Sequence, residues 1–291
     1  MKITVAWPAA RMVAVPQRVP RAASYALSDP IAPPKPLWAS ADWSSYPMNL
    51  SGAIRNRLMK QRSTPSHALA TSTTIGSTFP RRLIANVAVP NTPLVSRAIE
   101  YVRDYSEPYL FNHVMRSWLF AATLAEFRGV PYDPEVLAVS LLLHDLGLAE
   151  AFSGPLRFEV ESANAARAFA RKEGLDERRA QLIWDSVALN STPSIGLHKE
   201  SEVALCTMGI GVDWGGGWCY DSIDDHRMKS IVEAFPRLKM KERFTRTICG
   251  IVESRPETTY DNFARDFGER FIPGYRRPSL VDSLLNSPFE E

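Results

Sequence analysis

Apolar residues recur at helical spacing from Thr92 onward. The first predicted helix has Thr92 as its cap and Pro93 in its first turn, a combination favoured at helix starts. Its apolar positions then follow every three or four residues, at Leu94, Ala98, Val102 and Tyr105. This spacing indicates a helix with one face packed against a core.

Two longer apolar stretches follow this helix. One predicts a helix over residues 109–128, and Gly129 is placed to end it. The next helix opens at Asp133-Pro134, and its residues 136–143 are apolar nearly all round. A helix that is apolar on every side is expected to lie in the centre of the fold.

Further helices are predicted over residues 158–172, 176–189, 200–212, 224–234, 239–254 and 258–271. The loops between them are short, and no stretch alternates well enough to indicate a sheet. The expected fold class is therefore all-α, a helical bundle. Such bundles commonly hold metal sites between facing helices.

The first part of the chain has a different character. Up to residue 99 it holds twelve Lys and Arg against only Asp29 and Asp42, and twelve of the 22 prolines lie at or before Pro93. Such a composition predicts a basic, extended and largely irregular N-terminal arm over residues 1–91, followed by a helical domain over residues 92–291. Residues 1–28 lack acids, as transit peptides do, but their prolines oppose an amphipathic helix, so mitochondrial import is the minor alternative to a cytoplasmic location.

Composition also limits the partners. The chain has no run of about 18 apolar residues, so no membrane span is expected. Its three cysteines are not closely paired, which favours reduced thiols. The basic arm lacks a folded motif and interleaved aromatic residues, so no nucleic-acid partner is expected. The expected partner is a small-molecule substrate, and homo-oligomerisation stays open.

His144 and Asp145 end the most apolar helix and are the first candidates for chemistry. Polar groups at the end of a buried segment need compensation. A hydrogen-bonded core histidine beside a capping aspartate would satisfy them, and so would a metal ion. Adjacent side chains on a helix point about 100° apart, so both can reach one ion only at the helix end, where Gly147 lets the backbone turn away.

Two more residues can complete a metal site. His113 lies in the preceding helix, which a short connection makes an antiparallel neighbour, and Asp213 is an acid among apolar and small residues at another helix end. Each alone could be a structural hydrogen-bonding residue. Together with His144 and Asp145 they form a set of two nitrogen and two oxygen donors, which suits zinc, iron or manganese.

At this point the chain resembles the HD-domain superfamily, and more closely its cyanamide hydratase-like branch. The resemblance covers about residues 92–278. Its motifs are His113-Val-Met-Arg116, Leu142-Leu-His-Asp-Leu-Gly147, Phe158-Glu-Val-Glu-Ser-Ala-Asn164, Val212-Asp213, Arg255-Pro-Glu-Thr-Thr-Tyr260 and Phe271-Ile-Pro-Gly-Tyr275. It implies an all-α HD-domain bundle in which His113, His144, Asp145 and Asp213 hold one divalent transition metal.

The resemblance also implies roles near the metal. Asp145 would hold or deprotonate the attacking water, and His198 would donate a proton. Arg116, Glu161 and Asn190 are the candidate substrate-binding residues, although Arg116 and Glu161 could equally form ion pairs, and His198 could be a solvated loop residue. Asn190 departs from the pattern, because relatives usually have His there and an amide is a poor transition-metal ligand. This departure argues against a second metal.

Three functions are compatible with this sequence. A metal ion, with zinc favoured over iron or manganese, can lower the pKa of bound water to about 7, which suits a hydratase or hydrolase acting on a small nitrile-like substrate such as cyanamide. An HD-type phosphohydrolase acting on a small phosphorylated metabolite or nucleotide is the main alternative, with Arg116, Arg157 or Lys199 receiving phosphate. A binding or accessory protein with a structural metal is the third, and retention of all four ligands argues against it.

Overall fold

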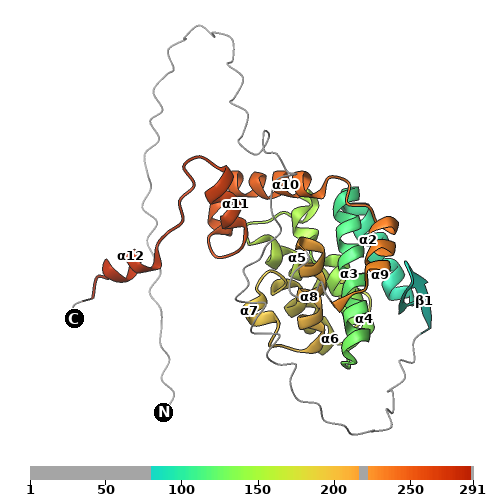
Figure 1. Cartoon of the computed structure of the whole chain (residues 1–291). Coiled ribbons are helices and arrows are strands. Elements are labelled where there is room, and N and C mark those ends of the chain that lie inside the picture. The colour runs from blue at the N-terminus through green and yellow to red at the C-terminus, as the bar shows by residue number, and fades with distance from the viewer. Residues whose placement is uncertain (1–79, 216–221, 290–291) are drawn as a thin grey trace, which may run out of the picture. The chain divides into compact units, whose positions relative to one another are not determined.

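The helical pattern is realised in the computed structural model, which describes residues 80–215 and 222–289 (Figure 1). The expected irregular arm lies outside the described residues, except for its last part, residues 80–91. The helices of the described residues are α2 (Pro93–Tyr105), α3 (Pro108–Arg128), α4 (Pro134–Leu143), α5 (Phe158–Lys172), α6 (Glu177–Ala188), α7 (Pro193–Gly196), α8 (Ser201–Gly215), α9 (Asp225–Ala234), α10 (Met240–Ser254), α11 (Ala264–Phe271) and α12 (Leu280–Leu285). The all-α class is confirmed.

Helix ends follow the local chemistry expected from the sequence. The Thr92 hydroxyl accepts a hydrogen bond from the Val95 amide, and the Asp133 carboxylate accepts from the amides of Glu135 and Val136. Gly129 adopts the left-handed conformation, φ 61°, and ends α3. These residues fix where α2 and α4 begin and where α3 ends.

The sequence did not predict the short helices α7 and α12, nor any strand. Strands β1 (Arg81–Ile84) and β2 (Val87–Pro90) form an antiparallel hairpin, the one sheet in the described part of the chain. Its two turn residues, Ala85 and Asn86, both have positive φ, as tight hairpin turns require. Val87 and Val89 are buried in the main core, so the folded part begins before Thr92. Strands of four residues are too short to show a clear alternation, which is why the sequence analysis missed them.

A second difference lies near the C-terminus. The single helix predicted over residues 258–271 is wrong: a 3₁₀ turn, η6 (Pro256–Thr259), is followed by α11. Asn262 separates them, since its side-chain amide donates to the Thr258 carbonyl while its side-chain oxygen accepts from the Ala264 amide. Asparagine side chains compete with helical hydrogen bonds in this way. The apolar spacing runs through the break and conceals it.

The close packing of α3 against α8 places the site. A Cβ atom on Gly209 of α8 would lie 2.4 Å from the Ser117 carbonyl oxygen of α3 and 2.7 Å from the Ala121 Cβ. Only glycine permits this approach. Asp213 lies one turn beyond Gly209 on α8, and His113 lies one turn before Ser117 on α3. Gly209 therefore brings the helix end that carries Asp213 against the part of α3 that carries His113.

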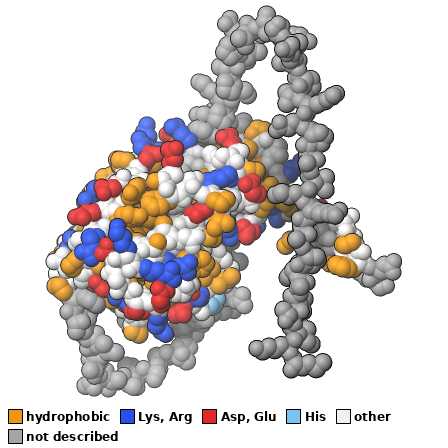
Figure 2. All heavy atoms as spheres, turned by 180° about the vertical axis from the view of Figure 1, so that it is seen from behind, with side chains coloured by type: hydrophobic (Ala, Val, Ile, Leu, Met, Phe, Trp, Pro, Cys, Tyr) orange, Lys and Arg blue, Asp and Glu red, His pale blue; other side chains and the backbone are white. Residues whose placement is uncertain are grey.

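The exterior of the described residues is mixed in charge. Figure 2 shows basic and acidic side chains interspersed over one face, with apolar side chains between them. Such mixing is expected on a water-exposed face. Among the described helices, none is long and apolar enough to cross a membrane.

Candidate metal centre

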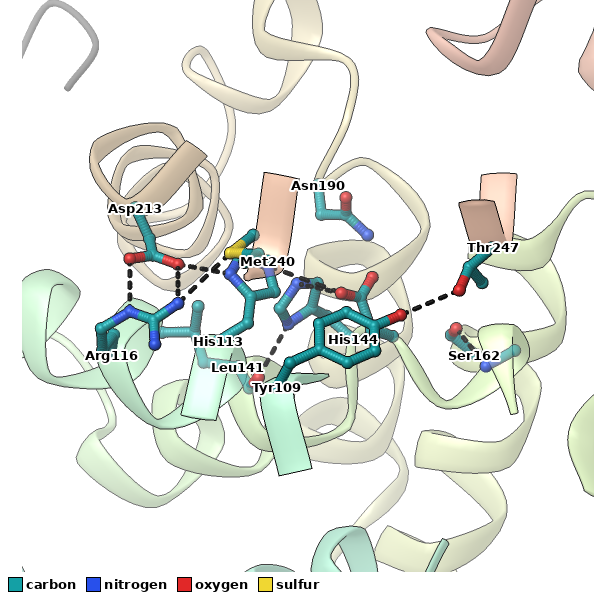
Figure 3. A network of polar contacts seen from close by, with 12 residues as sticks. Tyr109, His113, Arg116, Leu141, His144, Ser162, Asn190, Asp213, Met240 and Thr247 are labelled. Atoms are coloured by element: carbon teal, nitrogen blue, oxygen red, sulfur yellow. Dashed lines mark hydrogen bonds and ion pairs between the residues drawn. The ribbon is translucent and has the colours of Figure 1, made fainter. Parts of the chain in front are cut away.

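Three of the predicted ligands come together at the end of α4. His113, His144 and Asp145 each offer a ligand atom, and these atoms lie within 4.8 Å of one another. The Asp145 Oδ2 atom is 3.5 Å from His113 Nε2 and 3.3 Å from His144 Nε2. All three residues are buried, His113 and His144 to 1% exposure. Figure 3 shows the two histidine rings, whose centroids are 5.1 Å apart. The group could therefore hold a metal ion away from bulk water.

Local hydrogen bonds aim both imidazoles at the same point. His144 Nδ1 lies 2.8 Å from the Leu141 carbonyl oxygen, and His113 Nδ1 lies 2.6 Å from Asp213 Oδ2. A carbonyl or carboxylate oxygen only accepts, so each Nδ1 carries the hydrogen. Each Nε2 then keeps a lone pair directed toward Asp145. Metal-binding histidines are commonly oriented in this way through their other nitrogen.

The turn after His144 is fixed by its neighbours. The Gly147 amide donates to the Ser162 hydroxyl of α5 at 2.8 Å, and a Cβ at Gly147 would lie 2.2 Å from the Phe158 carbonyl oxygen. After α4 and Asp145 the chain forms a 3₁₀ turn, η3 (Leu146–Leu148). This anchoring holds Asp145 at the end of α4, where its side chain and that of His144 can bind the same metal ion.

The carboxylate of Asp145 supports the metal interpretation most directly. Its Oδ2 atom is buried and has no hydrogen-bond partner among the described residues. Burial alone would raise the pKa of Asp145, yet His144 and His113 in their protonated, positively charged forms lower it below the ordinary value. A cation bound in place of those protons has the same effect, and each imidazole is then neutral with its lone pair on Nε2. Burial likewise lowers the pKa of His144, but the charge and contact of Asp145, together with the hydrogen bond to the Leu141 carbonyl and the charge of Asp213, outweigh burial and raise it. A buried carboxylate oxygen that faces two imidazole lone pairs fits a bound cation.

Asp213 was expected to be a fourth ligand, and the structure places it behind His113 instead. Its carboxylate accepts two hydrogen bonds from the Arg116 guanidinium, at 2.6 and 2.8 Å, in addition to the one from His113 Nδ1. Arg237 adds a contact at 3.1 Å. Burial would raise the pKa of Asp213, but His113 and Arg116 hold it well below the usual range. In this geometry Asp213 orients a ligand, while direct ligation stays a prediction.

Arg116 does not point a free guanidinium at a substrate. Besides the two bonds to Asp213, its Nη1 donates to the carbonyl oxygens of Phe235 and Pro236, at 2.8 and 3.3 Å. The residue is fully buried. Of the two interpretations open from the sequence, the geometry favours the internal ion pair. The ion pair forms because a buried carboxylate such as that of Asp213 is stable only beside a positive charge.

The other predicted site residues, Asn190, Glu161 and His198, do not share one position relative to the metal ligands. Asn190 is buried at the end of α6, and its amide donates to the Val187 carbonyl at 2.6 Å; Figure 3 shows it near the ligands. Glu161 accepts from the Leu156 amide at 3.0 Å and so braces the loop before α5. His198 is exposed after α7, and no contact recorded for the described residues joins it to the ligands. Their roles in binding or catalysis stay predictions.

Sequence reasoning missed two residues beside the site. Arg237 contacts both the carboxylate and the backbone carbonyl of Asp213 from the loop before α10, and no periodic pattern marks a loop arginine. Tyr109 lies one turn before His113 on α3. Its position four residues from a candidate ligand was the available signal, because residues at that spacing share a helix face.

We expect the purified protein to carry about one transition metal per chain, because one group of converging donors is described and Asn190 offers poor ligation for a second ion. Elemental analysis after dialysis measures this. His144→Ala should lose the metal, and His198→Ala, which changes an exposed histidine, should keep it. Equal metal content in both variants would contradict the site.

His113, His144 and Asp145 therefore form a buried group that could hold a metal ion. A comparison of the chain with protein-family models and with curated proteins finds no match.

Proposed function

We propose that the protein is a metal-dependent hydratase that adds water to a small nitrile-like substrate such as cyanamide. The observation that carries the proposal is the convergence of His113 Nε2, His144 Nε2 and the unpartnered Asp145 Oδ2 on one buried point. The resemblance to the cyanamide hydratase-like branch of the HD-domain superfamily supports the same conclusion. Two imidazoles and a carboxylate are ligands typical of catalytic zinc, which we favour over iron or manganese.

The chemistry follows from what each side chain can do. A divalent ion bound here would supply Lewis acidity and lower the pKa of water to about 7 in the case of zinc. Asp145 lies against both histidines, and its unpartnered carboxylate oxygen is suited to accept a proton from the attacking water. Asp213 and Leu141 hold the two imidazoles in their orientations. The protein thus contributes a fixed set of donors and one acceptor of a proton.

The surroundings of the ligands favour a small, uncharged substrate. The Phe244 ring of α10 lies 6.2 Å from the His113 ring, and Trp214 packs at 5.0 Å from Phe244. Trp214 is 40% exposed, so these rings form an aromatic wall between the surface and the ligands. The aromatic wall itself offers a doubly charged phosphate no hydrogen-bond donors, so such a substrate would depend on the metal ion alone for compensation of its charge.

The cations considered for phosphate binding all have partners. Arg116 forms an ion pair with Asp213, and Lys199 forms one with Asp185. Arg157 forms ion pairs with Glu159 and Asp261. Phosphate recognition by any of them would need these contacts to break. The hydratase is therefore better supported than the phosphohydrolase, which becomes an alternative outcome of the test.

We expect the zinc-loaded protein to convert cyanamide to urea, and metal-free protein to be inactive until zinc is restored. Urea formation over time measures this, and a panel of phosphate esters is assayed in parallel. Metal dependence separates turnover by this site from a contaminating activity. Efficient phosphate release with no reaction of cyanamide or other small nitriles would replace the hydratase by the phosphohydrolase.

A further inference from the structure

A buried phenol lies next to the metal-binding group. Tyr109 is four residues before His113 on α3, and its side chain therefore projects from the same helix face. It is 1% exposed, and its hydroxyl oxygen lies 2.9 Å from the Thr247 hydroxyl of α10. Figure 3 shows Tyr109 extending from the helix that carries His113, with its hydroxyl toward Thr247. The hydroxyl is thus held against α10, on the face of α3 that also carries His113.

The phenol keeps its proton at neutral pH. Burial raises the pKa of Tyr109 to about 12, with Glu107 and Asp145 adding to the rise and Thr247 and Arg243 opposing it. Tyr109 is therefore a neutral hydrogen-bond donor in a site that otherwise presents lone pairs.

The hydroxyl hydrogen of Tyr109 can turn toward another acceptor while the hydrogen bond between Tyr109 and Thr247 is kept. Thr247 also lies 3.2 Å from the Arg243 carbonyl oxygen, its partner one turn earlier in α10. In one arrangement Thr247 donates to that carbonyl and accepts from Tyr109. In the other, Thr247 donates to Tyr109, whose own hydrogen is free to point elsewhere. A rotation of the two hydroxyl groups exchanges these arrangements while the oxygen atoms stay in place.

We propose that the Tyr109 hydroxyl is a catalytic hydrogen-bond donor that contacts the substrate. It donates to the nitrile nitrogen, the atom that becomes more negative as water adds to the carbon. This inference rests on the proposed function and gives it the donor that His198, exposed after α7, is poorly placed to supply. A fixed donor at the atom where charge develops stabilises the transition state more than the ground state.

Two variants separate this role from a structural one. Tyr109→Phe removes the donor and the bond to Thr247, whereas Thr247→Val removes the same bond and leaves the phenol in place. Both should fold and bind metal, and both should lose similar thermal stability because they lose one shared hydrogen bond. Metal content and thermal unfolding are measured first. Azide binding and cyanamide turnover of the two variants are then compared at equal metal content.

The probe is azide, a small anion that binds an accessible metal ion and presents a terminal nitrogen. Cobalt(II)-loaded protein reports binding through its visible absorption spectrum. We expect Tyr109→Phe to weaken azide binding about fivefold to tenfold, the usual effect of one hydrogen bond, and Thr247→Val to change it by less than about twofold. Cyanamide turnover should fall by at least about tenfold in Tyr109→Phe and stay within about threefold of wild type in Thr247→Val.

The outcomes distinguish the two proposals. Azide affinity and kcat unchanged in Tyr109→Phe, or reduced equally in both variants, would overturn the role of Tyr109 even if the wild-type protein hydrates cyanamide. A selective loss of azide binding in Tyr109→Phe would support that role even if cyanamide is not a substrate. In that case the hydratase proposal fails and the hydrogen-bond donor stands.

Discussion

Replacing Arg116 by methionine should lower the free energy of unfolding by about 3–5 kcal/mol, the usual effect of breaking a buried ion pair on one side. Methionine preserves much of the side-chain volume but none of the charge. Arg116 is fully buried, and it gives two hydrogen bonds to Asp213. Its loss leaves the Asp213 carboxylate in the core with only Arg237 and His113 as partners. Denaturant unfolding at pH 7 measures the effect.

The chain contains a matched control on its surface. Arg171 makes the same two-pronged contact with Glu177, at 2.9 and 2.7 Å, but the two side chains are 50% and 73% exposed. Arg171→Met should therefore have a much smaller effect on the free energy of unfolding than Arg116→Met, because water screens the exposed pair and replaces it. In a chain that already carries Asp213→Asn, Arg116→Met should lower the free energy of unfolding by less than it does in the wild type, because the two residues interact. Similar losses in Arg116→Met and Arg171→Met would contradict the importance of the buried pair.

Asp145→Asn should reduce cyanamide turnover by at least about 100-fold, the scale of losing a positioned acid or base. Asparagine keeps the shape of the side chain and removes the charge. In the structure the Asp145 carboxylate oxygen faces His113 and His144 and has no hydrogen-bond donor among the described residues. An amide there can neither accept a proton effectively nor contribute negative charge to a cation.

The comparison must be made at equal metal content, because Asp145→Asn should also weaken metal binding. Turnover is measured at saturating zinc, with the bound metal determined in the same samples. Asp185→Asn, which changes a partly exposed aspartate paired with Lys199, is the control and should leave turnover nearly unchanged. Turnover of Asp145→Asn close to that of wild type at full metal occupancy would show that another group accepts the proton.

The helical architecture could be predicted from the sequence because its signals are local. The predicted helix over residues 158–172 coincides with α5, and the caps at Thr92 and Asp133 and the stop at Gly129 were all read from single residues. Apolar spacing depends only on neighbours along the chain. The same dependence explains the errors: the hairpin of β1 and β2 is too short to show a period, and Asn262 breaks a helix without interrupting the apolar pattern.

The residues of the candidate site divide in the same way. The sequence by itself determined that His144 and Asp145 end a buried helix, since eight nearly uniformly apolar residues precede them. Only the tertiary structure decided that His113 joins them, that Asp213 stands behind His113 in a contact with Arg116, and that Tyr109 meets Thr247 from a helix more than a hundred residues away. The physical reason is that side-chain partners are chosen by how helices pack, and close approaches such as Gly209 against Ser117 set that packing between segments that no local pattern connects.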